Sequence, residues 1–431
     1  MKYKIGDLLE ITTKDQSKHT GKYLPSTDSK VLVLKLDSGY NIGLNKSNIK
    51  SIKLIKKSEE SKKVKLEYKP NPKLKTISIL HTGGTIASQV SYETGGVIAR
   101  YKPEELIAMF PELKNLANIK SRLISNMWSE DMNFNHYNLL AKEIQKEIKS
   151  GVDGIIVTHG TDMLAVTSAA LSFILEDLDT PVILVGAQRS SDRGSSDAFS
   201  NLFAACKFIT EIPFSEVAIC MHENSSDETC LILPGTKTRK MHTSRRDAFK
   251  PINTLPIARI HKTKIEVLTP HRKPEGRKLK LKLFNPKLKI GILKSHPNMV
   301  AKEVSNYKGF DGLILEGTGM AGNFPVNKID KYTSENYKIF NEIAKLAKKI
   351  PLIVTTQTIF GRINMNVYST GRKLQEVGIL GNHSDMLTET AFIKLAWLLS
   401  NYPKNKIKES VSHDFRGEIT KRTLYKEDFL E

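Results

Sequence analysis

Short apolar runs alternate with longer amphipathic patterns from Thr76 onward, and this rhythm constrains the fold most strongly. The runs TISIL, GIIVT, PVILVGA and EVAIC are almost wholly apolar, and patterns such as YNLLAKEIQKEIKS and SDAFSNLFAACKFITE lie between them. Strands that are apolar on both faces and alternate with helices are typical of a parallel sheet covered by helices on both sides. The sequence therefore predicts a doubly wound α/β domain over residues 75–269.

The flanking segments predict two further domains. After a basic, proline-containing stretch the rhythm resumes in IGILKSHP, FDGLILEGTG and PLIVTTQT, which indicates a second, smaller α/β domain. Ahead of residue 58, short alternating runs separated by turn residues are typical of a small all-β barrel. The predicted order is a barrel (1–57), a linker (58–74), the large α/β domain (75–269), a basic linker (270–289), the small α/β domain (290–410) and a tail (411–431).

Composition excludes several classes of protein. No run of 18 or more apolar residues occurs in the 431-residue chain, and the N-terminal MKYKIGDLLE lacks the apolar segment of a signal peptide. We therefore expect a soluble, cytoplasmic protein. Cys206, Cys220 and Cys230 have neither CxxC nor Cys/His metal spacing, which favours reduced thiols over disulfides and predicts no metal site.

The charge balance points to an acidic partner. The formal net charge is +20, and residues 1–70 contain sixteen Lys against eight Asp plus Glu. Lys and Arg replace condensed counterions on phosphate, so nucleic acid is the natural partner for such a surface. The alternative is a basic surface that is merely solvated, and charge alone does not separate the two.

The turn HTGGTIAS follows the first predicted strand of the large domain, where open α/β sheets bind their ligands. It matches neither the G-x-G-x-x-G of a dinucleotide fold nor the G-x-x-x-x-G-K-[ST] of a nucleotide cradle. Its hydroxyls, on Thr82, Thr85 and Ser88, remain as candidate reactive groups. The alternative is that they only hydrogen-bond the backbone of the turn.

A second strand ends in a similar way, in GIIVTHGTDML, so Thr161 and Asp162 emerge at the same sheet edge. A hydroxyl beside an acid suits the nucleophile and orienting group of a covalent hydrolase. Threonine needs a base, and a desolvated lysine can serve because burial lowers its pKa. We interpret His159 as a packed turn residue, and His81, His242 and His296 have no spacing that favours them.

Five motifs occur in the order expected of one enzyme family. They are TGGTIAS, MWSEDMN, THGTDM, PVILVGAQRSSDRGSSDAFSNL and RKMHTSRRDAF. Together they resemble the L-asparaginase family of amidohydrolases over about three quarters of the chain, residues 75–403. The resemblance implies that Thr85 is the nucleophile and that Thr161, Asp162 and a lysine form a second catalytic group. The "K…DAF" spacing selects Lys240, with Lys237 as the alternative.

The same resemblance implies the substrate contacts. Ser129 and Glu130 would hold the α-carboxylate and amine of the substrate, and Tyr92 would lie on a mobile lid. Gly95 and Gly96 would then be the hinge of this lid or a plain turn. Many free asparaginases have Gln at the position of Glu130, so the preference between Asn and Gln stays open. The family also implies at least a homodimer.

The N-terminal module extends the resemblance. YKIGDLLEIT together with KMHTSRRDAF is similar to the family of D subunits of archaeal glutamyl-tRNA(Gln) amidotransferases. This implies a glutaminase whose ammonia passes to a partner, the amidotransferase E subunit, which amidates Glu-tRNA(Gln) within a heterotetramer. No cofactor is expected in this chain, and ATP and Mg²⁺ are expected at the partner. The alternatives are a stand-alone L-asparaginase with an appended module and a non-catalytic RNA-binding protein.

Overall fold

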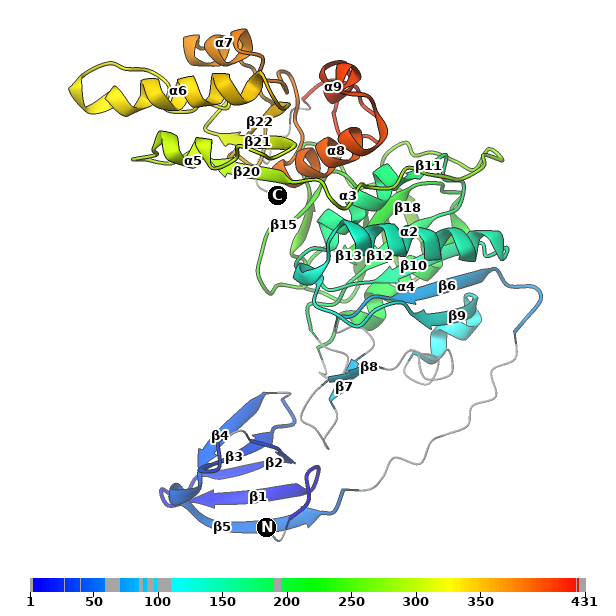
Figure 1. Ribbon diagram of the computed structural model, residues 1–431. Coiled ribbons are helices and arrows are strands. Elements are labelled where there is room, and N and C mark those ends of the chain that lie inside the picture. The colour runs from blue at the N-terminus through cyan, green and yellow to red at the C-terminus, as the bar shows by residue number, and fades with distance from the viewer. Residues whose placement is uncertain are drawn as a thin grey trace.

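The computed structural model describes residues 3–26, 28–38, 40–58, 70–84, 88–90, 97–99, 110–189, 195–423 and 425. The chain forms an N-terminal sheet, a large α/β domain and a small α/β domain (Figure 1). Cys206, Cys220 and Cys230 are buried and free. Within the described ranges, no helix has the length and apolar character needed to cross a membrane.

The N-terminal domain is a five-stranded antiparallel sheet in the order β4-β3-β2-β1-β5. Alternate residues of its strands point to one face, so Leu9, Ile11, Leu32 and Leu34 form a small common core. This arrangement confirms the all-β prediction. The strands are β1 (Leu8–Thr13), β2 (Lys18–Leu24), β3 (Val31–Lys35), β4 (Asn41–Asn45) and β5 (Ile49–Lys56), with a 3₁₀ turn, η1 (Lys46–Asn48), before the last.

The large domain is built on an eight-stranded sheet in the order β18-β17-β14-β13-β12-β10-β6-β9. Five neighbouring strands are parallel: β9 (Asn118–Leu123), β6 (Thr76–His81), β10 (Gly154–Thr158), β12 (Val182–Val185) and β13 (Val217–His222). Three more continue it antiparallel: β14 (Thr229–Pro234), β17 (Ala258–His261) and β18 (Ile265–Val267). The wholly parallel sheet of the sequence prediction is therefore extended, because a short turn joins β13 to β14 as a hairpin.

Helices cover both faces of this sheet, which confirms the doubly wound class. The helices α2 (Phe134–Lys149) and α3 (Leu164–Ile174) pack on one face with Ile155 and Val157 of β10. The helix α4 (Ala198–Glu211) packs on the other face with Ile156. Because successive strand residues face opposite ways, β10 is buried along its whole length.

The small domain contains a parallel three-stranded sheet of β20 (Ile290–Lys294), β21 (Gly312–Gly317) and β22 (Leu352–Thr356). Its helices are α5 (Ala301–Ser305), α6 (Ser334–Ala347), α7 (Ser369–Glu376), α8 (Thr388–Asn401) and α9 (Lys404–Val411). The helix α8 also packs against α3 of the large domain, where the rings of Trp397 and Phe173 lie 5.2 Å apart. The two α/β domains therefore share one hydrophobic core.

The basic stretch 270–289 packs along the large domain. Its short strand β19 (Lys280–Leu281) pairs with β11 (Leu175–Glu176), which directly follows α3. After α9 the chain folds back irregularly, and Glu418 forms a fully buried ion pair with Lys394 of α8, with Nζ and Oε1 2.7 Å apart. Both segments therefore lie against the domains that they follow.

Candidate active site

The loops after β6 and β10 leave the sheet side by side. The two strands are parallel neighbours, and His81 is the register partner of Thr158. The backbone N–H and the hydroxyl of Thr82 both donate to the carbonyl of Thr158, at 3.1 and 3.0 Å. The two hydroxyl-bearing motifs of the sequence therefore begin at one point on the carboxyl edge of the sheet.

The paired glycines allow the first loop to lie directly against its neighbours. Gly83 and Gly84 have φ angles of +123° and +84°, which side chains rarely adopt. A Cβ on Gly84 would lie 2.9 Å from the backbone nitrogen of Gly160, and one on Gly83 would lie 2.3 Å from the carbonyl oxygen of Met127. Both positions therefore need glycine, because of the positive φ angle and because there is no room for a Cβ.

Thr161, Asp162 and Lys240 meet at the second loop. The ammonium group of Lys240 lies 2.9 Å from Thr161 Oγ1 and 2.9 Å from Asp162 Oδ1. Lys240 ends β15 (Thr238–Lys240), which forms a hairpin with β16 (Phe249–Pro251). The lysine side chain is 14% exposed and the Asp162 side chain 68% exposed, so the lysine is largely buried while the carboxylate is open to solvent.

Lys237, the alternative lysine, lies elsewhere. Its ammonium group is 2.8 Å from Asp385 Oδ2, and both side chains are buried. Burial is the largest influence on this lysine and lowers its pKa, against the opposing charge of Asp385. The structure therefore places Lys240, and not Lys237, beside Thr161.

Ser129 and Glu130 adjoin the same loop. Ser129 begins a 3₁₀ turn, η3 (Ser129–Asp131), and its hydroxyl accepts from Met163 N at 3.3 Å and donates to Glu130 Oε2 at 3.1 Å. A Cβ on Gly160 would lie 2.9 Å from Ser129 Cβ, so the turn lies directly against the second loop. Thr85, Tyr92, Gly95 and Gly96 fall outside the residues that the structure describes.

Two buried histidines support the loops. Burial lowers the pKa of His81 to about 3 and that of His159 to about 4, so both imidazoles are neutral at pH 7. His81 bonds Thr158 Oγ1 at 2.7 Å, and His159 bonds Gly160 O at 2.7 Å and Thr167 Oγ1 at 2.9 Å. These contacts fit the packed-turn interpretation of His159.

The other two histidines considered from the sequence make local contacts. His242 Nδ1 accepts from the backbone of Ser244 and Arg245, both at 3.1 Å. His296 pairs with Glu303 at 2.7 Å in the small domain. In the part of the chain that the structure describes, no group of three or more His, Cys, Asp or Glu is placed to hold a metal ion.

Two supporting residues were given no role by sequence reasoning. A Cβ on Gly186, at the end of β12, would lie 2.8 Å from Thr161 Cγ2, so this glycine makes room for the candidate threonine. Asp197, which is fully buried, accepts from Gln188 N at 3.0 Å and Arg189 N at 2.9 Å and fixes the loop that follows β12. A glycine ending an apolar strand was the available signal for the first. Asp197 had no such signal, because Gln188 and Arg189, whose backbone N–H groups it accepts from, lie at the other end of the loop.

Solved structures define the class first. The chain is similar to the thermostable L-asparaginase from Thermococcus kodakarensis, with a TM-score of 0.69 and 28% identity over 80% of this chain and 99% of that one. It is also similar to L-asparaginase I from Vibrio cholerae, with a TM-score of 0.68 and 26% identity over the same shares. The fold is therefore that of the asparaginase-like α/β proteins.

Family models and full-length relatives narrow this class. The models match as "Asparaginase, N-terminal" over residues 76–273, "Glutaminase/Asparaginase C-terminal domain" over 289–410 and "GatD N-terminal domain" over 3–55. The glutamyl-tRNA(Gln) amidotransferase D subunit of Methanococcus maripaludis strain C7 is 41% identical over 425 residues, which cover 96% of this chain and 98% of that protein. The D subunit of Pyrococcus furiosus is 40% identical over 435 residues, covering 97% and 95%. The chain belongs to the family of glutamyl-tRNA(Gln) amidotransferase D subunits.

Proposed function

We propose that this chain is the glutaminase subunit of a tRNA-dependent amidotransferase. It hydrolyses the side-chain amide of glutamine or asparagine and supplies ammonia to a partner that converts Glu-tRNA(Gln) to Gln-tRNA(Gln). The observation that carries the proposal is the Lys240–Thr161–Asp162 group at the carboxyl end of β10, in a chain that aligns with D-subunit relatives over nearly its full length.

The chemistry proceeds in two steps. The hydroxyl of Thr85 adds to the amide carbon, and loss of ammonia leaves an ester between Thr85 and the substrate acyl group. Water then attacks this ester, which releases glutamate or aspartate and restores the hydroxyl. The protons move through Lys240 and Thr161, whose Nζ and Oγ1 lie in hydrogen-bond contact at 2.9 Å.

Lys240 Nζ lies 2.9 Å from Asp162 Oδ1, and the Asp162 side chain is 68% exposed. A substrate ammonium that pairs with this exposed carboxylate competes with Lys240 for it, and the lysine is then left with Thr161 as its partner. Ser129 and Glu130 complete the grip on the α-carboxylate and amine, and Tyr92 closes over the bound amide.

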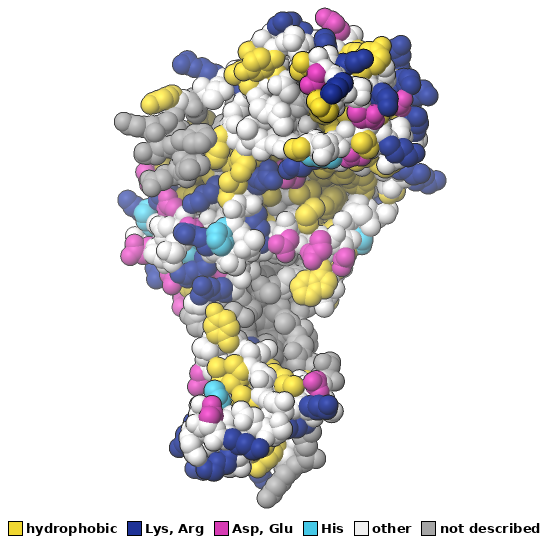
Figure 2. Space-filling model, turned by 90° about the vertical axis from the view of Figure 1, so that its left-hand side faces the viewer, with side chains coloured by type: hydrophobic (Ala, Val, Ile, Leu, Met, Phe, Trp, Pro, Cys, Tyr) yellow, Lys and Arg dark blue, Asp and Glu magenta, His cyan; other side chains and the backbone are white. Residues whose placement is uncertain are grey.

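The two subunits carry out different steps of the reaction. Activation of Glu-tRNA(Gln) uses ATP and Mg²⁺ at the partner, the amidotransferase E subunit, and this chain needs no cofactor of its own for amide hydrolysis. We further propose a cytoplasmic heterotetramer in which two copies of this chain form a homodimer. The N-terminal sheet domain matches the GatD N-terminal domain model over residues 3–55 and has Lys and Arg on its visible face (Figure 2), which suits docking beside the partner or tRNA.

Ammonia release tests the proposal directly. The full-length chain is assayed with glutamine and with asparagine, alone and with the E subunit, ATP and Glu-tRNA(Gln). We expect release from glutamine to rise when the partner and tRNA are present and the chain to co-purify with the partner. Full asparagine hydrolysis without a partner, together with no complex, would support the stand-alone asparaginase instead.

A further inference from the structure

A cavity lies at the edge of the large domain's sheet opposite the catalytic loops. It has a volume of about 320 Å³ and is lined near Val217, which begins β13, and Pro234, which ends antiparallel β14. Thr161 follows the carboxyl end of β10, which is parallel to β12 and, through it, to β13. The two sites are thus at opposite edges of the same sheet, and the volume is in the range of small-ligand pockets.

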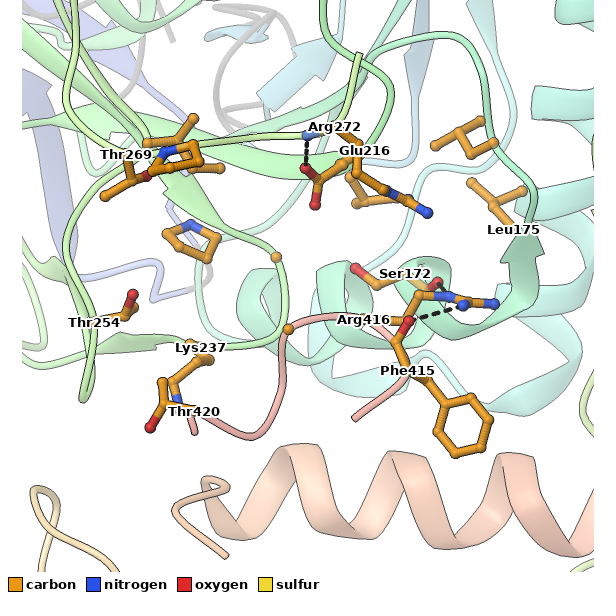
Figure 3. Close-up of a pocket in the computed structure, with 17 residues that line it drawn as sticks. Ser172, Leu175, Glu216, Lys237, Thr254, Thr269, Arg272, Phe415, Arg416 and Thr420 are labelled. Carbon is orange, nitrogen blue, oxygen red and sulfur yellow. Dashed lines mark hydrogen bonds between the residues drawn. The ribbon is translucent and has the colours of Figure 1, made fainter. Parts of the chain in front are cut away.

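Two arginines give the cavity a positive wall. Arg416 Nε donates to Ser172 O at 2.8 Å and Nη1 donates to Phe415 O at 2.9 Å (Figure 3). Its Nη2 is buried and forms an ion pair with Glu176 Oε2 at 3.7 Å. Burial is the largest influence on Arg416 and lowers its pKa, and the nearby positive charge of Arg272 lowers it further. Two guanidinium groups therefore lie close enough together to influence one another.

A carboxylate faces these arginines. Glu216 Oε1 accepts from the backbone N–H of Arg272 at 2.6 Å, and Figure 3 shows its carboxylate directed into the cavity. The remaining wall is largely apolar, with Leu175, Val217 and Ile257 among its residues, and it also carries the threonines Thr254, Thr269 and Thr420. The cavity thus presents a positive group, a negative group and hydroxyls to one small volume.

We propose that this cavity is a second binding site that takes a free α-amino acid with a polar side chain. The α-carboxylate binds the guanidinium group of Arg272, and the nearby charge of Arg416 adds to the attraction, because hydrogen bonds between charged groups are the stronger ones. The ammonium binds Glu216, and the side chain reaches the threonine wall. The paired charges of a zwitterion match this arrangement, whereas a simple anion would be repelled by the Glu216 carboxylate.

Lys237 connects this cavity to the catalytic hairpin. It lines the cavity beside Thr420, and its chain continues directly into β15, which ends at Lys240. A ligand in the cavity therefore contacts the segment that leads into the strand of the candidate catalytic lysine. The site is separate from amide hydrolysis, and its occupancy is measured by binding rather than by turnover.

Equilibrium dialysis with labelled L-glutamate, which carries no amide to hydrolyse, tests the proposal on the full chain. We expect two molecules bound per wild-type chain at saturation. Arg272→Met should weaken one of them at least tenfold, and Asp162→Asn should weaken the other. The matched control is Lys273→Met, which removes the adjacent exposed cation and should leave the binding of both molecules unchanged. If the proposed catalytic site is wrong, only one molecule should bind per chain. Asp162→Asn should still bind this molecule, and Arg272→Met should not.

A second variant separates a zwitterion site from an anion site. Glu216→Gln keeps an oxygen to accept from Arg272 N but removes the negative charge, so it should weaken L-glutamate and leave the weaker binding of N-acetyl-L-glutamate unchanged. The proposal is overturned if N-acetyl-L-glutamate binds the wild type as tightly as L-glutamate. It is also overturned if Arg272→Met, shown by thermal unfolding to be folded, binds as the wild type does.

Discussion

Lys237, just before β15, and Lys240, at its end, are three residues apart, yet they occupy opposite environments. Lys237 is buried against Asp385 of the segment before α8, while Lys240 reaches Thr161 and Asp162 at an open loop. Lys237 lies in the bend just before β15, and Lys240 is the last residue of that strand. The start of this hairpin therefore joins the two α/β domains, and the end of β15 forms part of the candidate active site.

The two lysines also differ in what surrounds their charge. Asp385 is almost fully enclosed and also accepts from Thr420 N at 2.9 Å, so its pair with Lys237 is fixed on all sides. Asp162 is 68% exposed, so water or a substrate can replace Lys240 as its partner. A closed pair serves stability, and an open pair serves exchange of partners during a reaction.

The largest effect is expected at Lys240. Lys240→Met should lower amide hydrolysis by about 10²–10⁴-fold, because it removes the group that carries protons next to Thr161. The stability of the chain should change little, since the lost partner Asp162 is exposed and such pairs contribute about 0–1 kcal/mol. Ammonia release and thermal unfolding measure the two quantities. Retained hydrolysis would show that Lys240 is not catalytic.

Lys237→Met should give the reverse pattern. It leaves the enclosed carboxylate of Asp385 without its cation, which we expect to lower the free energy of unfolding by about 3–5 kcal/mol. The double variant Lys237→Met, Asp385→Leu should regain much of this stability, because no unpaired charge remains. Denaturant titration checks both, with hydrolysis measured below the unfolding transition. A loss of activity without a loss of stability would reverse the assignment of the two lysines.

A buried histidine below the catalytic loop provides a pH test. The unfolded chain protonates His159 near pH 6.5, whereas burial lowers its pKa to about 4 in the folded chain. The unfolded state thus binds more protons in this window, so the stability is fully present above pH 6.5 and is lost as the pH falls toward 4. The loss between pH 7 and pH 5 is about 2 kcal/mol. We expect the free energy of unfolding, measured by denaturant titration at pH 7 and pH 5, to fall by about 2 kcal/mol more in the wild type than in His159→Gln. An equal fall in both proteins would contradict the prediction.

The smallest effect is expected at Glu130. Glu130→Gln keeps an acceptor for the Ser129 hydroxyl but removes the charge proposed to bind the substrate amine. The KM for the amide substrate should rise about tenfold with a smaller change in kcat. The neighbouring exposed Asp131→Asn is the matched control and should behave as the wild type. A lower kcat at unchanged KM would place Glu130 in the chemical step instead.

Local patterns were enough to predict the domain classes. The apolar runs predicted the strands of the parallel core, and the alternating runs predicted the N-terminal all-β domain. The antiparallel extension from β14 to β18 was missed, because apolar periodicity does not encode strand direction. Thr85 and Tyr92 lie outside the described residues, so their roles stay predictions.

The sequence by itself determined which chemical groups stand at the ends of buried strands: HTGGT after one and HGTDM after the next. This is local information, since a strand, a glycine turn and a hydroxyl follow one another in the chain. Only the tertiary structure decided which distant groups meet them. The choice of Lys240 over Lys237 depends on which lysine reaches Thr161 and which reaches Asp385, and the cavity between Arg272, Glu216 and Arg416 depends on the fold-back of the chain after α9. Such meetings depend on packing between segments far apart in the chain, which no local pattern records.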